Sequence, residues 1–328
     1  MRYLRALSVA AAAVTLLATP VLAATEWLMA TGYPDNNFHT VNHRKFVEEV
    51  EAETKGEIKI TMHTNGTLIK ESPIKRAVQS RQVQMGEIRL GVYGNEDPMY
   101  VVDGLPFLAT TYEDSWKLKE AAKGYLNALF AKNGMRILYY SPWPGQGFYT
   151  KTPVNTAEDL KGKKLRIYSL PTQKMGDLLG MRATILPFAE IPQAFSSGLI
   201  DALFTSPQTG IDIQAWENTS YFTNVGAIFS RQAVIVNEAA FSALPKNVQD
   251  VMLAAAERAE KRAWTMSDES NKAQLKILAE KGMKVSEVPA PLLAQMKKMG
   301  ATMLEDWRKT ASPEANAALD NYLKAATN

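Results

Sequence analysis

An uninterrupted run of helix-forming residues in the last third of the chain limits the possible folds most. Residues 246–281 contain neither proline nor glycine and are rich in alanine, glutamate, lysine and leucine. As one helix, this run would be about 54 Å long, which exceeds the size of one small domain. A helix of this length predicts a strut between two lobes. The alternative is a pair of ordinary helices joined near residues 266–268.

The first half of the chain alternates segments with the period of a strand and segments with the period of a helix. Phe38, Val41, Phe46 and Val50 are expected to form the inward face of its first helix. The alternation predicts a mainly parallel sheet with helices on both faces. The predicted strands are 26–30, 57–63, 88–92 and 135–140, and the predicted helices are 37–54, 72–83 and 115–132.

The second half repeats this alternation, which indicates two lobes. A segment rich in proline and glycine, 142–147, marks the first crossing between them, and the apolar segment 230–236 marks the second. We expect an α/β fold of two lobes, each a mixed, mainly parallel sheet flanked by helices. The predicted strands are 148–151, 165–168, 183–185 and 202–204, and the helices are 171–179 and 189–196. The first lobe is predicted to comprise 24–146 and 232–265, and the second 147–231 and 266–328.

The first 23 residues have the pattern of an export signal. Arg2 and Arg5 precede the apolar residues 6–17, and residues 21–23 provide a cleavage site before Ala24. The apolar run is shorter than the roughly 20 residues that a membrane span needs, and Pro20 interrupts it. We therefore expect residues 1–23 to be a signal peptide and the protein to be secreted to the periplasm.

The composition argues against several classes of function. The chain has 37 Lys and Arg against 34 Asp and Glu, and without Arg2 and Arg5 the count becomes 35 against 34. A nearly neutral chain gives no support for nucleic-acid binding. The chain has no cysteine, so no disulfide, thiolate chemistry or lipidated N-terminal cysteine is expected. No segment after residue 23 is long and apolar enough to span a bilayer, and a freely diffusing monomer is expected.

One arginine lies within a predicted strand, in a pattern that favours anion binding. In residues 164–168, KLRIY, Leu165 and Ile167 would share one face, while Arg166 and Tyr168 would share the other. The planar guanidinium group matches a carboxylate with two parallel hydrogen bonds, and ligands of α/β sheets usually bind near strand ends. The alternative is that Arg166 only continues a solvated basic surface formed by the neighbouring lysines.

Three motifs follow in order around this arginine: LKGKKLRI at 160–167, PFAEIPQAF at 187–195 and SGLIDA at 197–202. They resemble the signature of the DctP-like solute-binding subunits of TRAP transporters, which runs D-L-x-G-x-K-[IL]-R, P-x-x-[ED]-x-x-x-A-[LF] and x-G-x-[VI]-D-[GA]. Weaker resemblance at 66–68, 86–88 and 105–107 extends over nearly all of the chain after residue 23.

The resemblance implies a receptor without catalytic chemistry, metal or cofactor. A small organic acid would bind between the lobes, Arg166 would take its carboxylate, and the closed form would deliver it to the small and large membrane subunits of the permease. The long helix would run across both lobes. The expected ligand contacts are Arg166, Tyr168, Phe188, Phe204, Ser206, Trp143, Phe148 and Tyr149, together with Asn37, His39, Lys70 and Glu71 from the first lobe.

Two departures from the family pattern bear on the ligand. Where relatives often read Gly-Phe-Arg, this chain has Gly-Phe-Tyr at 147–149, and where they often read Asp-Gly-Gln-Glu-Asn-Pro, it has DALFTSP at 201–207. Ser206 is the nearest substitute for the family's asparagine contact. These changes make the pocket less charged and more aromatic. They favour one carboxylate on a hydrophobic or aromatic body over a dicarboxylate or a sugar acid.

Several alternatives stay open. The same class of protein could bind a C4 dicarboxylate or a sugar acid, or serve an ATP-driven transporter or a sensor kinase. An exported enzyme acting on small acids is disfavoured, because the chain has no Gly-x-Ser-x-Gly motif, phosphate loop or dinucleotide fingerprint. His39 and His43 are four residues apart but lack the glutamate of the metalloprotease motif, so no metal site is expected.

Overall fold

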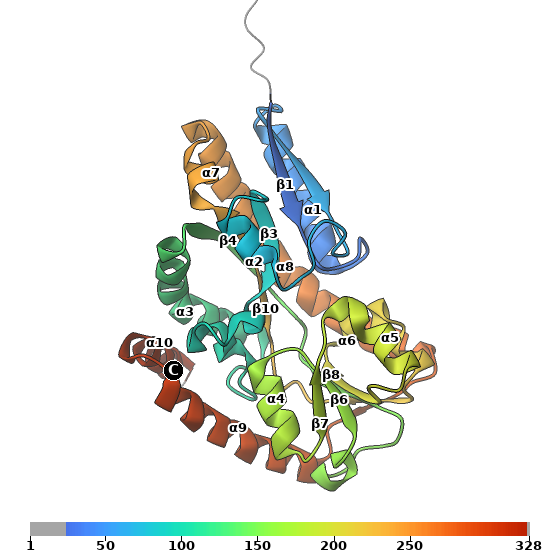
Figure 1. Cartoon of the computed structure of the whole chain (residues 1–328). Coiled ribbons are helices and arrows are strands. Elements are labelled where there is room, and N and C mark those ends of the chain that lie inside the picture. Colours follow the sequence, from blue (N-terminus) through green and yellow to red (C-terminus); the bar gives the residue numbers. More distant parts are fainter. Residues whose placement is uncertain (1–23, 327–328) are drawn as a thin grey trace, which may run out of the picture.

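The computed structural model describes residues 24–326, and two mixed sheets organise it (Figure 1). The first sheet has the strand order β2-β1-β3-β10-β4, in which β1 is parallel to β2 and β3, while β10 is antiparallel to β3 and β4. Its strands are β1 (Thr25–Ala30), β2 (Ile58–His63), β3 (Met85–Arg89), β4 (Met135–Pro142) and β10 (Arg231–Asn237).

The second sheet has the order β11-β9-β5-β8-β6-β7. The pairs β6–β7, β6–β8 and β9–β11 are parallel, while β5 is antiparallel to both of its neighbours. The predicted two-lobed α/β fold is therefore confirmed. The strands are β5 (Gly147–Thr150), β6 (Lys164–Ile167), β7 (Arg182–Ile185), β8 (Ala202–Thr205), β9 (Tyr221–Asn224) and β11 (Lys284–Glu287).

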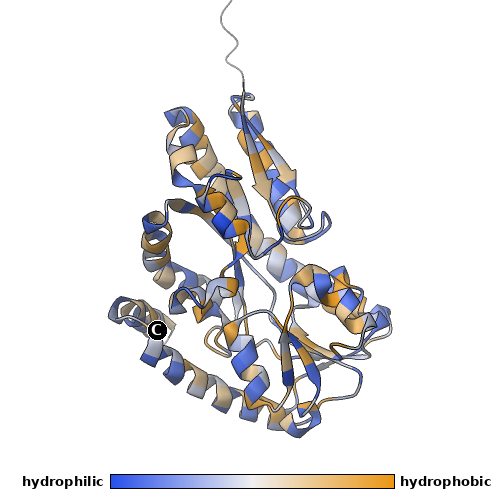
Figure 2. Ribbon diagram, viewed as in Figure 1, coloured by the Kyte–Doolittle hydropathy of each residue, from blue (hydrophilic) through white to orange (hydrophobic). Residues whose placement is uncertain are grey.

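Helices cover both sheets. In Figure 2 most helices carry hydrophilic and hydrophobic residues together, as expected of helices that bury one face. The α-helices are α1 (Phe38–Glu53), α2 (Ile74–Gln79), α3 (Tyr112–Lys132), α4 (Leu170–Leu178), α5 (Ile191–Ser196), α6 (Pro207–Asp212), α7 (Glu238–Ser242), α8 (Lys246–Glu280), α9 (Ala290–Thr310) and α10 (Pro313–Ala326). Short 3₁₀ helices are η1 (Leu90–Tyr93), η2 (Pro98–Gly104), η3 (Ala157–Leu160), η4 (Phe188–Glu190) and η5 (Ala215–Glu217).

Helix α8 is continuous over 35 residues, which confirms the prediction of a single strut. It contacts α1 and β4 in the first lobe and α6 and β11 in the second. Alanines on its buried face let α1 approach closely, and the Asn42 side chain of α1 donates a hydrogen bond to the Ala259 carbonyl at 2.9 Å. The helix therefore joins the two lobes through contacts along its whole length.

The two crossings between the sheets run side by side. The Trp143 backbone N–H, just after β4, donates to the Ser230 carbonyl at 2.8 Å, and that of Gln146 donates to Ile228 at 3.2 Å. Ser230 immediately precedes β10, which lies between β3 and β4 in the first sheet and is buried throughout. A change in lobe angle therefore has to bend both crossings together.

The predicted elements of both halves are present, with exceptions that have physical causes. Residues 88–92 divide between the end of β3 and the 3₁₀ helix η1, and residues 189–196 begin with η4. Val41 was expected to face inward, but it is 45% exposed. The buried face of α1 is centred on Phe46 and Val50, and at 100° per residue Val41 lies opposite them.

The C-terminal helices lie against both lobes. Helix α9 contacts α4 of the second lobe, while α10 packs on α3 of the first, where the Tyr322 hydroxyl donates to the Leu108 carbonyl at 2.6 Å. The predicted division of the chain into lobes stays a prediction, and these contacts argue for moving residues 313–326 to the first lobe. The predicted signal peptide, residues 1–23, lies outside the described residues. Within 24–326, no helix combines the length and the apolar character that crossing a bilayer requires.

Candidate ligand-binding site

A small cavity lies between the two lobes. Arg89, the last residue of β3, reaches it from the first lobe, while Arg166 of β6 and Thr205, the last residue of β8, reach it from the second. It thus forms where strands of both sheets end, the usual place for ligands in α/β folds. The lining residues are Tyr33, Arg89, Trp143, Gln146, Arg166, Tyr168, Phe188, Thr205, Ser206, Thr209 and Ser230.

Arg166 is 1% exposed, so the alternative that it belongs to a solvated basic surface is wrong. As predicted for β6, Leu165 and Ile167 join the hydrophobic core, while Arg166 and Tyr168 line the cavity. The Arg166 Nε donates to the Leu186 carbonyl at 3.1 Å, and its buried Nη2 has no acceptor among the described residues. Burial, together with the charge of Arg89, lowers the pKa of Arg166 to about 10, so it remains a cation at neutral pH.

Arg89 is a second buried guanidinium that the sequence analysis missed. Its Nη2 forms an ion pair with Glu71 Oε1 at 2.8 Å, and the Tyr33 hydroxyl donates to the same oxygen at 3.2 Å. A second charged residue at the end of the buried β3, directly after the family motif at 86–88, was the available signal. Arg89 therefore has a carboxylate partner, whereas Arg166 has none among the described residues.

The Tyr168 ring faces both guanidinium groups. The Cζ atoms of Arg89 and Arg166 lie 4.6 and 5.3 Å from its centroid, within the range of cation–π attraction. Its hydroxyl donates to Gln146, whose Nε2 donates to the Ser230 hydroxyl at 3.0 Å. Burial raises the pKa of Tyr168 to about 12, so this hydroxyl remains neutral. Both arginines are thus held in place without being neutralised by Tyr168.

Aromatic rings form the remaining wall. The Tyr33 ring lies 5.1 Å from Trp143 and 5.2 Å from Phe188, between centroids. The Trp143 indole N–H is buried and has no acceptor within the described residues. The cavity therefore combines an apolar wall, a free N–H donor and several hydroxyl groups. It also holds two guanidinium groups, of which one is paired with a carboxylate.

A family model for bacterial extracellular solute-binding proteins of family 7, the DctP family, matches residues 29–310. The chain belongs to this family.

Similar proteins of known structure share the fold over nearly the whole chain. A Bordetella pertussis extracytoplasmic solute receptor binding pyroglutamic acid is 41% identical, with a TM-score of 0.90 over 91% of this chain and 99% of that chain. A marine metagenome TRAP solute-binding protein specific for pyroglutamate is 36% identical, with a TM-score of 0.90 over 92% and 100%. The C4-dicarboxylate-binding periplasmic protein DctP of Rhodobacter capsulatus is 27% identical over 73% of this chain and 72% of its own. The predicted membership of the DctP-like TRAP receptors is thereby confirmed.

The predicted contacts of the receptor divide into those that line the cavity and those that do not. Arg166, Tyr168, Phe188, Ser206 and Trp143 line it. Their role as ligand contacts stays a prediction. The sequence analysis missed Tyr33, Arg89, Gln146, Thr205, Thr209 and Ser230, several of which lie in turns and crossings without a periodic pattern.

Three predicted contacts of the second lobe are core residues instead. Phe148 and Phe204 are cross-strand partners in β5 and β8, and their rings pack at 4.8 Å between centroids. The Tyr149 hydroxyl donates to the Ser206 carbonyl at 3.1 Å. A Cβ atom at Gly210 would lie 2.1 Å from that hydroxyl, so the glycine makes room for it. Tyr149 therefore positions the Ser206 turn from behind the cavity.

The four predicted contacts of the first lobe take different places. Glu71 binds Arg89, and Lys70 is exposed. The His39 ring lies behind Trp143 at 4.4 Å, and burial lowers its pKa well below the usual range. Asn37 caps α1 with its side-chain oxygen and donates from Nδ2 to Asp212 at 2.8 Å, which links the two lobes.

No metal site was found in the part of the chain that the structure describes. His43 contacts Glu87 at 3.0 Å and the Tyr139 hydroxyl at 2.8 Å, and these groups occupy both of its ring nitrogens. Among residues 24–326, no cluster of three or more His, Cys, Asp or Glu is arranged to hold a metal ion.

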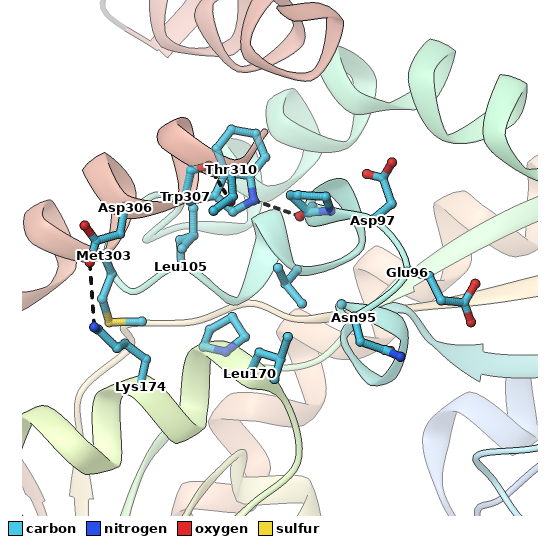
Figure 3. Close-up of a pocket in the computed structure, with 14 residues that line it drawn as sticks. Asn95, Glu96, Asp97, Leu105, Leu170, Lys174, Met303, Asp306, Trp307 and Thr310 are labelled. Atoms are coloured by element: carbon cyan, nitrogen blue, oxygen red, sulfur yellow. Dashed lines mark hydrogen bonds and ion pairs between the residues drawn. The ribbon is translucent and has the colours of Figure 1, made fainter. Parts of the chain in front are cut away.

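A wider groove lies between η2, α4 and α9 (Figure 3). Leu105, Leu170 and Met303 contribute to its apolar surface. The Trp307 indole donates to the Pro98 carbonyl at 2.7 Å, and Lys174 forms a half-exposed ion pair with Asp306 at 3.7 Å. Because the charges of this pair are solvated and balanced, the groove offers an anion no buried partner. The cavity at Arg166 is the better candidate site.

Proposed function

We propose that this receptor binds pyroglutamate in the periplasm and delivers it to the small and large membrane subunits of a TRAP permease. It acts by stoichiometric binding, without turnover, and Arg166 is the main carboxylate ligand. The charge of the cavity carries this proposal. Two buried guanidinium groups face the cavity, and Glu71 is the one carboxylate that contacts either of them among the described residues. A single ligand carboxylate completes the balance.

The net positive charge of the cavity also accounts for closure of the two lobes on the ligand. The closed arrangement brings Arg89 of the first lobe and Arg166 of the second to one Tyr168 ring. Without an anion, closure buries one uncompensated positive charge, which is unfavourable. A bound carboxylate removes this cost, so the ligand shifts the population toward the closed form.

The neutral part of the lining suits a lactam. Pyroglutamate has one carboxylate, one N–H donor and one carbonyl acceptor, and it lacks the ammonium group of free amino acids. Thr205, Ser206 and Thr209 offer hydroxyl groups, and Trp143 offers its free N–H. The two pyroglutamate-binding relatives, at 41% and 36% identity, support this choice.

The expectation of an aromatic ligand body keeps only part of its support. Tyr149 and Phe204, on which it rested, do not line the cavity, whereas Tyr33, Trp143 and Phe188 do. The hydroxyl groups that line the cavity favour a small polar ring over a purely apolar body. A C4 dicarboxylate is the main alternative, because a relative at 27% identity is named for that class.

Calorimetry with three related ligands tests the proposal. Pyroglutamate is a monoanion, proline is a zwitterion with the same ring size, and glutamate has two carboxylates and an ammonium group. We expect one-to-one binding of pyroglutamate that is about tenfold or more tighter than that of the other two, because a buried ammonium would lack a free carboxylate. A hundredfold excess over its dissociation constant should stabilise the fold by about 2.7 kcal/mol.

Two results would contradict the proposal. Tighter binding of succinate, glutamate or galacturonate would refute pyroglutamate as the ligand. Chemical conversion of pyroglutamate by the purified protein would refute the role of a receptor without turnover.

A further inference from the structure

We propose that Glu71 sets the charge selectivity of the cavity and makes the receptor prefer monoanions to dianions. The inference rests on the proposed monocarboxylate function and assigns the selectivity to a residue that does not itself line the cavity. By neutralising Arg89, Glu71 leaves the cavity with one net positive charge from two guanidinium groups and one carboxylate.

Glu71 is fixed in place by its surroundings. It lies in the turn before α2 and is 8% exposed. Its Oε1 accepts from the Arg89 Nη2 and from the Tyr33 hydroxyl, so the oxygen that faces Arg89 is fully engaged. A Cβ atom at Gly32 would lie 3.1 Å from the Glu71 Cβ, which shows how closely the chain packs against it. These contacts hold the carboxylate against Arg89.

The other buried charges nearby do not alter this balance. Arg231 pairs with Asp103 at 3.2 Å, and Glu87 lies against His43. Asp212 accepts hydrogen bonds from two side-chain amides. None of these groups lines the cavity. The charge that a ligand meets is therefore set by Arg89, Arg166 and Glu71.

This balance separates ligands by their charge. A monocarboxylate neutralises the cavity, whereas a dicarboxylate would leave one carboxylate buried without a free cation. If the charge of Glu71 were absent, Arg89 could bind that second carboxylate, because its positive charge would no longer be balanced and its buried Nε already lacks an acceptor in the described chain.

A set of variants that changes the net charge of the cavity in single steps tests the inference. Glu71→Gln raises the cavity charge by one and keeps an oxygen acceptor for Arg89 and Tyr33. Arg89→Gln lowers the charge by one, and the double variant restores the parent's charge. Glu190→Gln makes the same change in charge on an exposed residue of η4 and is the matched control. Dissociation constants for pyroglutamate and succinate are measured by calorimetry on the folded proteins.

We expect Glu71→Gln to shift the succinate-to-pyroglutamate affinity ratio toward succinate by about tenfold or more, while Glu190→Gln shifts it by less than about twofold. Arg89→Gln should weaken the binding of pyroglutamate by about tenfold or more. Adding Glu71→Gln should recover part of this loss, because the net charge of the cavity returns to the parent's value. This recovery distinguishes a charge effect from the loss of a hydrogen bond to Arg89.

Three outcomes would overturn the inference. An unchanged affinity ratio in folded Glu71→Gln refutes it while leaving the proposed function intact. If that variant does not fold, equal pyroglutamate affinities of Arg89→Gln and the parent refute it instead. If the parent binds no monocarboxylate, the proposed function and the inference fail together.

Discussion

Two buried arginines of this receptor are surrounded by different charges. Arg166 and Arg231 are each 1% exposed, and both have guanidinium nitrogens without acceptors in the described chain. Arg231, however, donates from Nε and from its backbone N–H to Asp103, at 3.2 and 2.8 Å. Arg166 lines the cavity, and its Nε donates to the Leu186 carbonyl.

The comparison shows why Arg166, and not Arg231, is proposed as the arginine that binds the ligand. Burial and unpaired N–H groups are common to both residues, so neither feature identifies the site. The difference is the carboxylate, because Asp103 forms an ion pair with Arg231, whereas no carboxylate within residues 24–326 forms an ion pair with Arg166. An arginine that waits for a ligand anion must be held in position by groups that leave its charge unbalanced.

The largest expected effect is a loss of stability when Arg231 loses its carboxylate partner. Asp103→Asn leaves Arg231 buried without a carboxylate, which should lower the free energy of unfolding by about 3–5 kcal/mol. Urea unfolding measures this loss, and pyroglutamate affinity should change little wherever the variant is folded. A loss below about 1 kcal/mol would show that the pair contributes no more than a surface ion pair.

The next largest effect is expected at Arg166 and concerns the affinity for pyroglutamate. Arg166→Ala removes both proposed hydrogen bonds to the ligand carboxylate. It should weaken the binding of pyroglutamate by about 2–5 kcal/mol, roughly thirtyfold to several thousandfold in the dissociation constant. The fold should survive, because no carboxylate of the described chain loses a partner. Arg166→Lys should recover only part of the loss, since lysine lacks the planar fork. Binding of pyroglutamate by folded Arg166→Ala within about threefold of the parent would remove Arg166 from the site.

Asp212 extends the comparison to the pH dependence of stability. Burial raises the pKa of Asp212 to about 6, against the opposing hydrogen bonds from Asn37 and Gln208. Between pH 4 and 6 the folded state then binds more protons than the unfolded state, so this group makes stability fall as pH rises. Asp212→Asn should therefore gain stability relative to the parent from pH 4 to 7, by roughly 2 kcal/mol. Parallel pH profiles of the melting temperature for the two proteins would contradict this expectation.

The smallest effects are expected at the lysines beside Arg166. Lys163 lies just before β6 and Lys164 is its first residue, and their ammonium groups donate to the Thr152 hydroxyl and to the Gly198 carbonyl. Replacing either by alanine should change pyroglutamate affinity by less than about 1 kcal/mol in calorimetry. A larger loss would mean that the positive charge of the whole strand, and not Arg166 alone, holds the anion.

The sequence by itself determined the features that depend on local periodicity. The proline- and glycine-free run predicted the continuous helix α8, because a helix of 35 residues needs only good helix formers and an apolar stripe. The alternation in residues 164–168 predicted which side of β6 carries Arg166, because successive side chains of a strand point to opposite faces. The ordered motifs predicted the family.

Only the tertiary structure decided which residues meet at the cavity. Phe148 and Phe204 lie in strands whose two faces are both buried, so alternation could not tell the core face from the cavity face. Arg89 and Glu71 come from the first lobe and Arg166 from the second, so the balance of their charges arises only where the two lobes meet. Coulomb interactions depend on distance in space and on burial, and neither can be read from spacing along the chain.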